Sequence, residues 1–273
     1  MRAGIFAKSF AGTDPLSVLS RARQAGYGCV QYNLACSGLP SMPDEVPEAA
    51  LEAIAAASRG TGVTIAALSA TYNMIHPDIA VRERGMKRLD VALAAAAKLA
   101  IPLVTLCTGT RDPDDQWRHH PDNQTPEAWR DLAIEMEKAA RLAEAHGVNL
   151  GIEPEQANVV RDADDALRLM RDVPSAAIRI VLDPANLFDH ADQAEARRIV
   201  ADAIEKLGER IALAHAKDRD ASGNFVTAGR GVVDFADFVG RLRQAGFDGA
   251  LVTHGLSEAE APDVARFLKE LLG

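Results

Sequence analysis

The chain contains few cysteines, and this scarcity bears on its redox environment. Only Cys29, Cys36 and Cys107 occur among 273 residues, and no two of them have the close spacing of a metal-binding pair. Proteins that depend on a disulfide framework usually carry an even and larger number of cysteines. A disulfide framework is therefore not expected, and a reducing compartment fits the sequence better.

The chain also lacks an excess of positive charge, a signal peptide and a membrane-spanning segment. Its 30 Lys and Arg against 39 Asp and Glu give a formal net charge of −9, which argues against binding along a nucleic acid backbone. Residues 1–6 enter a strand-like pattern without the apolar stretch of a signal peptide. The most membrane-like stretch, residues 91–107, is interrupted by Lys98 and Pro102. We expect a cytoplasmic protein with no nucleic acid partner and no membrane partner.

Two apolar periodicities alternate along the chain. Strand-like runs cover residues 3–9, 29–33, 64–69, 103–108, 149–153, 178–183, 211–215 and 250–254. Helical patterns lie at 14–25, 47–60, 78–99, 125–146, 162–172, 191–207, 234–245 and 258–272. Eight such units predict an α/β fold in which parallel strands close into a (β/α)8 TIM barrel. Since no linker interrupts residues 1–273 and no GxGxxG follows the first strand, we expect one barrel domain rather than an open doubly wound sheet.

Four side chains that can bind a divalent metal end the last four strand-like runs. They are Glu153, Asp183, His215 and His254, separated by 30, 32 and 39 positions, about one strand and helix each. The carboxyl ends of barrel strands meet at one face, where active sites are built. Each residue alone could cap a turn or satisfy a local hydrogen bond, but four polar groups converging without a partner would be costly. The joint pattern predicts a metal site and therefore a metal-dependent enzyme.

The segments around these residues resemble a known family. They are residues 151–155 (GIEPE), 181–186 (VLDPAN), 215–218 (HAKD), 229–235 (GRGVVDF) and 251–256 (LVTHGL). In this order and spacing the chain resembles, over essentially its whole length, the sugar phosphate isomerase/epimerase family of xylose-isomerase-like TIM barrels. The resemblance implies a divalent metal ion (Mn, Mg, Zn or Co) held at the ends of strands five to eight. Carried over by position, it makes Glu153, Asp183 and His215 metal ligands.

His254 departs from the pattern of that family, in which a second glutamate most often ends the eighth strand. In epimerases of that kind two glutamates exchange protons on opposite sides of the substrate, and this chain offers only Glu153. His254 could complete the metal site through a neutral imidazole, or titrate as an acid or base. Glu153 is the expected base if one of its oxygens stays free of the metal.

Lys217 is a further catalytic candidate. It lies two residues after His215 and faces the same way if the strand continues. Its ammonium could bind a phosphate or carboxylate as a point charge, or it could pair with Asp218 or another acid at the rim. The nearby residues 229–231 (GRG) are too short for a phosphate loop and are typical of a tight turn.

Polar and aromatic residues in the loops after the strands are candidates for contacts with a sugar-like substrate. They are Tyr72, Asn73, Glu155, Asn158 and Asn186, together with Trp117, His119, His120 and Asn123 in the long loop 109–124. Loops of that length are usually functional. Trp117 could stack on a sugar ring or anchor the loop, and Asn186 could bond a substrate hydroxyl or cap the following helix.

These features favour an isomerase or epimerase acting on a small sugar, keto-sugar or sugar derivative, with or without a phosphate. The metal would polarise a carbonyl while a base moves a proton. A metal-dependent lyase could use the same base, and a sugar-binding barrel without turnover would fit the missing second glutamate. A nuclease with a zinc cluster would need histidines on strands two to four, which end in residues 31–33 (QYN), 69–71 (SAT) and 108–110 (TGT). A homo-oligomer is compatible with the sequence.

Overall fold

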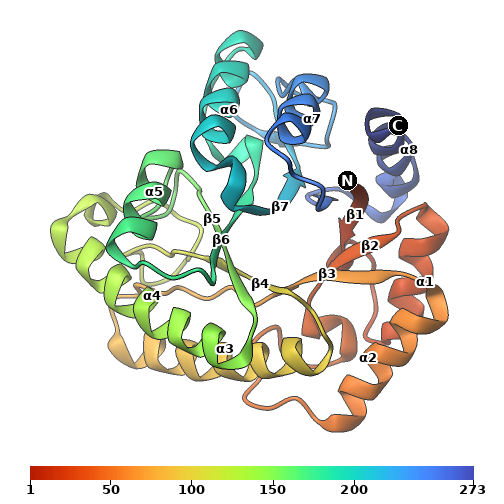
Figure 1. Cartoon of the computed structure of the whole chain (residues 1–273), viewed down its shortest axis with the longest axis horizontal. Coiled ribbons are helices and arrows are strands. Elements are labelled where there is room, and N and C mark those ends of the chain that lie inside the picture. Colours follow the sequence, from red (N-terminus) through yellow and green to blue (C-terminus); the bar gives the residue numbers. More distant parts are fainter.

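The computed structural model describes residues 1–273 and confirms the predicted (β/α)8 barrel (Figure 1). Eight parallel strands close in the order β1-β10-β7-β6-β5-β4-β3-β2. Their bounds are β1 (Arg2–Phe6), β2 (Cys29–Tyr32), β3 (Thr64–Ser69), β4 (Leu103–Cys107), β5 (Asn149–Glu153), β6 (Ile178–Leu182), β7 (Ile211–Ala216) and β10 (Ala250–Thr253). The closing pair, β1 and β10, brings the first and last strands together, with Arg2 in register with Ala250.

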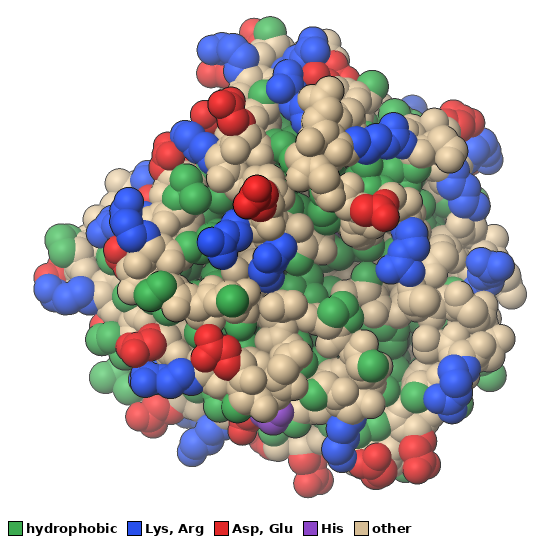
Figure 2. Space-filling view, in the orientation of Figure 1, with side chains coloured by type: hydrophobic (Ala, Val, Ile, Leu, Met, Phe, Trp, Pro, Cys, Tyr) green, Lys and Arg blue, Asp and Glu red, His purple; other side chains and the backbone are tan.

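Eight helices surround the strands (Figure 1). They are α1 (Pro15–Ala25), α2 (Glu48–Thr61), α3 (Ile79–Lys98), α4 (Pro126–His146), α5 (Ala163–Asp172), α6 (Gln193–Leu207), α7 (Phe235–Gln244) and α8 (Ala261–Leu272). None of these helices combines the length and apolar character needed to cross a membrane. Figure 2 shows acidic and basic side chains interspersed over one face rather than gathered by sign.

Local sequence explains where the helices begin and end, as α4 illustrates. Thr125 caps its first turn by accepting a hydrogen bond from the amide of Ala128, and Pro126 occupies the first helical position. Glu127 places an acid in that turn, where the helix dipole favours negative charge. The helix ends at Gly147, which has a φ of 68° that a residue with a side chain rarely adopts.

The core has two parts. A large cluster of 70 buried residues fills the space between the strands and the helices. A small cluster lies apart from it and contains Cys29, Ala67, Leu103, Val181, Leu213, Ala250 and Val252. All seven lie within barrel strands, so they form a packed layer of the kind that fills barrel interiors. The barrel is therefore closed below its carboxyl end, and a ligand can enter only above this layer.

The structure differs from the sequence prediction at two places near that end. The predicted first strand, residues 3–9, stops at Phe6, and Ala7–Ser9 form a 3-10 turn instead. A short antiparallel hairpin, β8 (Asp218–Arg219) with β9 (Phe225–Val226), follows β7 and was not predicted. Two-residue strands carry too few side chains to show a periodicity, so the sequence gives no sign of them.

Candidate active site

A cavity of about 490 Å³ opens at the carboxyl ends of the barrel strands. Its wall includes Gln31 from β2, Ser69 from β3, Thr105 from β4, Glu153 from β5 and His215 from β7. Only three of its 17 lining residues are hydrophobic. The volume is that of a small-molecule site, and the polar wall suits a hydroxylated ligand rather than an apolar one.

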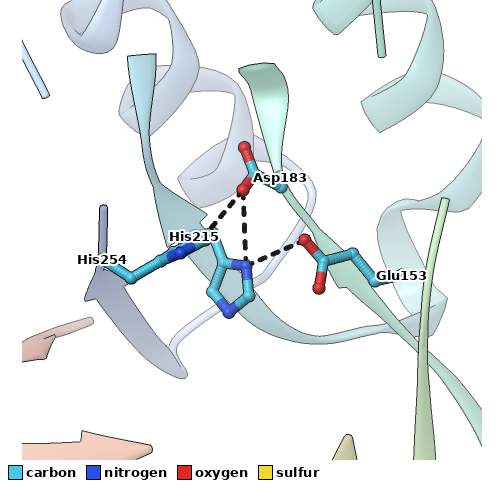
Figure 3. A group of neighbouring side chains, drawn as sticks. All are labelled: Glu153, Asp183, His215 and His254. Carbon is cyan, nitrogen blue, oxygen red and sulfur yellow. Dashed lines mark hydrogen bonds and ion pairs between the residues drawn. The ribbon is translucent and has the colours of Figure 1, made fainter. Parts of the chain in front are cut away.

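The four predicted metal-binding side chains converge at this cavity (Figure 3). One ligand atom from each of Glu153, Asp183, His215 and His254 lies within 4.8 Å of all the others. Asp183 Oδ2 is 3.1 Å from His254 Nε2 and 3.5 Å from His215 Nδ1. His215 Nδ1 is 3.2 Å from Glu153 Oε1. Two carboxylates and two imidazoles at this separation are a donor set that fits Zn, Co or Mn.

Asp183 caps a turn and also faces the cluster. It immediately follows β6, and its Oδ1 accepts a hydrogen bond from the amide of Ala185 at 2.9 Å, which caps the 3-10 turn Pro184–Asn186. Its Oδ2 points to the imidazoles, and the side chain is fully buried. The cap fixes the orientation of the carboxylate, so one oxygen is held toward the cluster.

His215 is oriented from across the barrel by Gln31. Its Nε2 lies 2.8 Å from Gln31 Oε1, while Gln31 Nε2 donates to Thr105 Oγ1 at 3.1 Å. Because the amide oxygen can only accept, His215 Nε2 carries a proton. Its Nδ1 is thereby directed toward Glu153 and Asp183, which is the orientation that a metal-binding histidine needs.

Mutual charges stabilise the cluster in its ionised form. Burial would raise the pKa of Glu153, but the charge of His215, its hydrogen bond and the charge of Lys217 together hold that pKa below its ordinary value. Burial likewise opposes ionisation of Asp183, but Lys217 and hydrogen bonds from both histidines hold its pKa well below the usual range. Burial would lower the pKa of His215, yet Glu153 and Asp183 raise it to about 9. A proton on His215 therefore balances the carboxylates where a metal cation would do so.

Two neighbouring groups shift in the opposite sense. Burial and the charge of His215 lower the pKa of His254, which leaves its imidazole neutral near neutral pH and able to bind a metal. Burial and the charge of Glu153 raise the pKa of Glu155 to about 7. Glu155 lines the cavity two residues after Glu153.

Lys217 lines the cavity and pairs with Asp183 rather than with Asp218. Its ammonium donates to Asn186 Oδ1 at 2.6 Å and lies 3.2 Å from Asp183 Oδ2. The predicted alternative of a pair with Asp218 is wrong. The Asp218 carboxylate instead accepts hydrogen bonds from the amides of residues 229, 231 and 233. Asp218 thus holds the 229–231 turn, and Lys217 joins the acidic cluster.

The structure separates the predicted substrate contacts into two groups. Glu155, Asn186 and Trp117 line the cavity. Asn186 also donates to Glu153 Oε1 at 2.7 Å, so it contacts the cluster directly. The others do not line this cavity: Tyr72, Asn73, Asn158, His119, His120 and Asn123.

Most residues of this second group support loops. The ring of Tyr72 packs so closely on α3 that a Cβ at Gly85 would meet it at 2.0 Å. Asn73 donates to the carbonyl oxygen of Thr110, and Asn158 Oδ1 accepts from the amide of Gly109.

The long loop after β4 is held in the same way. Asn123 Oδ1 accepts from the amide of Arg111 at 2.7 Å. His120 caps the 3-10 turn Pro121–Gln124, whereas His119 is exposed. These contacts hold the loop that carries Trp117 to the cavity.

Ten of the 17 lining residues were not singled out as site residues from the sequence, and Gln31, Lys8 and Phe225 are among them. Gln31 lies near the end of β2 and carries an uncharged amide, which is not a usual metal ligand. Lys8 lies in a segment predicted as strand, and Phe225 lies in the unpredicted hairpin. Position at a strand end was the available signal for Gln31.

Comparison with known proteins places the chain in a family. The family model described as xylose isomerase-like TIM barrel matches residues 19–271. A search of curated proteins finds no significant match. The structure is similar to that of L-ribulose 3-epimerase, with a TM-score of 0.74 and 21% identity over 100% of this chain and 98% of that one.

Two other solved structures show the same fold. One is 3-keto-D-glucoside 4-epimerase from E. coli, with a TM-score of 0.76 and 16% identity over 100% of this chain and 99% of that one. The other is D-psicose 3-epimerase from Clostridium cellulolyticum H10, crystallised with D-tagatose, with a TM-score of 0.74, 16% identity and the same coverage. At these sequence identities, the structural similarity establishes the fold alone.

Proposed function

The chain belongs to the xylose isomerase-like TIM barrel family, and on this basis we propose that it is a metal-dependent isomerase or epimerase of a small sugar or sugar derivative. The observation that carries the proposal is the convergence of four ligand atoms within 4.8 Å at a polar cavity. The similar folds of three sugar epimerases support the same class of reaction.

Glu153, Asp183, His215 and His254 would hold the metal. When bound there, a divalent ion would polarise a substrate carbonyl and lower the pKa of the adjacent C–H bond. The cap on Asp183 and the Gln31 bond to His215 pre-orient two of the four donors. Because His254 is neutral, it suits the role of fourth ligand.

Glu153 is the proposed base that moves the proton on carbon. Its Oε1 accepts from Asn186 and lies against His215, whereas its Oε2 has no hydrogen-bond partner in the protein. One carboxylate oxygen is therefore held by the site while the other is available at the cavity wall. This is the arrangement that a ligand also acting as a base requires.

The remaining lining residues would bind and orient the substrate. Lys217 can place a positive charge beside a developing oxyanion. Glu155 and Asn186 can bond hydroxyl groups, and Trp117, which is 49% exposed at the cavity, offers a ring face to a sugar. His254 stands in place of a second glutamate, so proton exchange from two faces by paired glutamates is not part of the proposal.

The test is exchange of substrate C–H protons with D₂O during turnover of a sugar panel by the metal-loaded protein. Glu153→Gln keeps the side-chain shape, so the fold should persist while turnover and exchange fall by ~10²–10⁴. Glu83→Gln on α3, an exposed residue outside the cavity, is the matched control and should behave as wild type.

Other outcomes would redirect the proposal. Exchange that survives intact in Glu153→Gln rules out Glu153 as the base. Turnover without any solvent exchange would indicate a hydride shift instead of proton transfer. Tight metal binding with no turnover across the panel would favour a sugar-binding barrel, and a dehydrated product would identify a lyase.

A further inference from the structure

Charge is distributed unevenly around the cavity wall. Its lining carboxylates are Glu153, which ends β5, and Glu155, which lies two residues later, whereas its lysines, Lys8 and Lys217, follow β1 and β7. In the closed barrel β10 lies between β1 and β7, so the two lysines follow the strands on either side of the one that precedes His254. The part of the wall that follows β7, β10 and β1 contains no carboxylate. The cavity thus has an acidic side and a basic side.

Lys8 has a charge that no protein group balances. It lies in the turn Ala7–Ser9, is exposed, and forms no hydrogen bond or ion pair with another residue. It nevertheless lines the cavity. Its ammonium is therefore free to bind a group that the ligand brings to this side.

Lys217 retains part of its binding capacity. Its ammonium uses one donor on Asn186 and one on Asp183, and an ammonium has three. The group is also held 4.1 Å from the centre of the Phe225 ring. Lys217 is largely buried, so its interaction with an incoming anion would be screened by water less than that of Lys8.

The cluster does not neutralise these lysines once it is occupied. A divalent ion would balance the two carboxylates, Glu153 and Asp183, since the histidines that complete the set are neutral ligands. Lys8 and Lys217 would then have Glu155 as the one remaining acid among the lining residues. A neutral sugar would leave this positive side of the cavity without a partner.

We infer that the substrate carries an anionic end group, a carboxylate or a phosphate ester, that binds on the side of Lys8 and Lys217. This inference rests on the proposed function and narrows its substrate class to a sugar acid or a sugar phosphate. The carbon chain would run from Glu153 past the metal site, with its anionic end toward the carboxyl ends of β7, β10 and β1.

The inference is tested by calorimetry on the full-length protein loaded with Mn²⁺ or Zn²⁺. The probes are D-gluconate, D-sorbitol 6-phosphate and D-sorbitol, which share a six-carbon chain and differ at one end, together with their four-carbon counterparts erythronate, erythritol 4-phosphate and erythritol. At least one anion should bind about tenfold or more tightly than the neutral polyol of equal length, as expected for hydrogen bonds to charged groups. Comparing the two anions shows whether a carboxylate or a phosphate is preferred.

Variants of Lys8 test the named residue. Lys8→Met should weaken binding of the preferred anion about tenfold and leave the polyol unchanged, and Lys8→Arg should restore it. Lys87→Met on α3, another exposed lysine and one outside the cavity, is the matched control. Lys8 is preferred to Lys217 for this test because Lys217 contacts Asp183 and its loss would disturb the cluster.

The inference is overturned if the polyols bind as tightly as the anions, or if Lys8→Met weakens both equally. It is also overturned if no anion of either length binds. In each of these cases the D₂O exchange assay on the sugar panel still reports on the isomerase or epimerase activity itself, so the two proposals fail separately.

Discussion

The two halves of the barrel rim differ in the chemistry they carry. The ends of β5, β6, β7 and β10 supply Glu153, Asp183, His215 and His254, all ionisable. The ends of β2, β3 and β4 supply Gln31, Ser69 and Thr105 to the cavity, all neutral. One half can hold a metal and move protons, whereas the other can only donate and accept hydrogen bonds.

Residues of the neutral half nonetheless orient a side chain of the ionisable half. Thr105 accepts from Gln31 at 3.1 Å, and Gln31 fixes which nitrogen of His215 faces the carboxylates. The bond spans the barrel, since β2 and β7 are not neighbours. The candidate metal site, built on four strands, is thus oriented by residues of two others, as outer hydrogen bonds commonly orient metal ligands.

The largest effect is expected from the ionisable half. Asp183→Ala removes a buried ligand, so we expect metal affinity measured by calorimetry to fall by more than ~10²-fold, beyond the loss typical of an outer partner. It also leaves Lys217 and two histidines without their shared carboxylate, which should lower the free energy of unfolding by about 3–5 kcal/mol.

The controls for this prediction are a milder variant and a remote one. Asp183→Asn keeps the side-chain volume and should remain folded while still losing metal. Asp44→Ala, an exposed partner of Arg88, should change neither quantity appreciably. Unchanged metal affinity in both Asp183 variants would remove this residue from the site.

A smaller effect is expected from the neutral half. Gln31→Met removes the acceptor for His215 Nε2 while roughly preserving side-chain length. Metal affinity should fall by about 10–100-fold, the range reported for partners that orient metal ligands. Gln244→Met, an exposed glutamine at the end of α7, serves as control. Equal affinities of Gln31→Met and wild type would show that the two halves are independent.

Taken per pH unit, the pH dependence should be the smallest effect. The pKa of His215 is raised to about 9, so a metal must displace a proton from it below that pH. Metal affinity should therefore rise by about tenfold per pH unit up to pH 9 and then level off.

In the metal-free protein, the raised pKa of His215 makes the stability fall, rather than the metal affinity rise, as the pH increases. The stability that the protonated His215 contributes is fully present below its unfolded pKa of about 6.5 and is lost as pH rises through about 9. Thermal unfolding of metal-free protein across pH 6–10 measures this loss. His215→Gln should flatten both profiles, and profiles that persist in that variant would assign the titration to another group.

The fold and the positions of the ionisable residues could be predicted because both depend on periodicity. Apolar strands ending in Glu, Asp or His are visible in the sequence, and barrel closure alone brings their ends to one face. The sequence left open whether Asp183 caps a turn or faces the cluster. In the structure it does both, because Oδ1 caps the turn at Ala185 while Oδ2 faces the histidines.

The contributions of loops could not be predicted in the same way. Tyr72 and Asn73 lie in the loop after β3, yet Tyr72 packs closely on Gly85 and Asn73 bonds to Thr110, so both support neighbouring segments. Gln31 has no charge to mark it, and its role depends on a bond to a residue 184 positions away. Side-chain direction in loops follows from long-range contacts, which periodicity does not encode.

The central claim is that four strand ends form one metal site, and a crystal of the protein soaked with Zn²⁺ tests it most directly. We predict a single anomalous peak about 2.0–2.2 Å from a carboxylate oxygen of Glu153 and of Asp183 and about 2.0–2.1 Å from His215 Nδ1, with His254 as the fourth ligand. A fully occupied zinc ion elsewhere, with none among these residues, would contradict it.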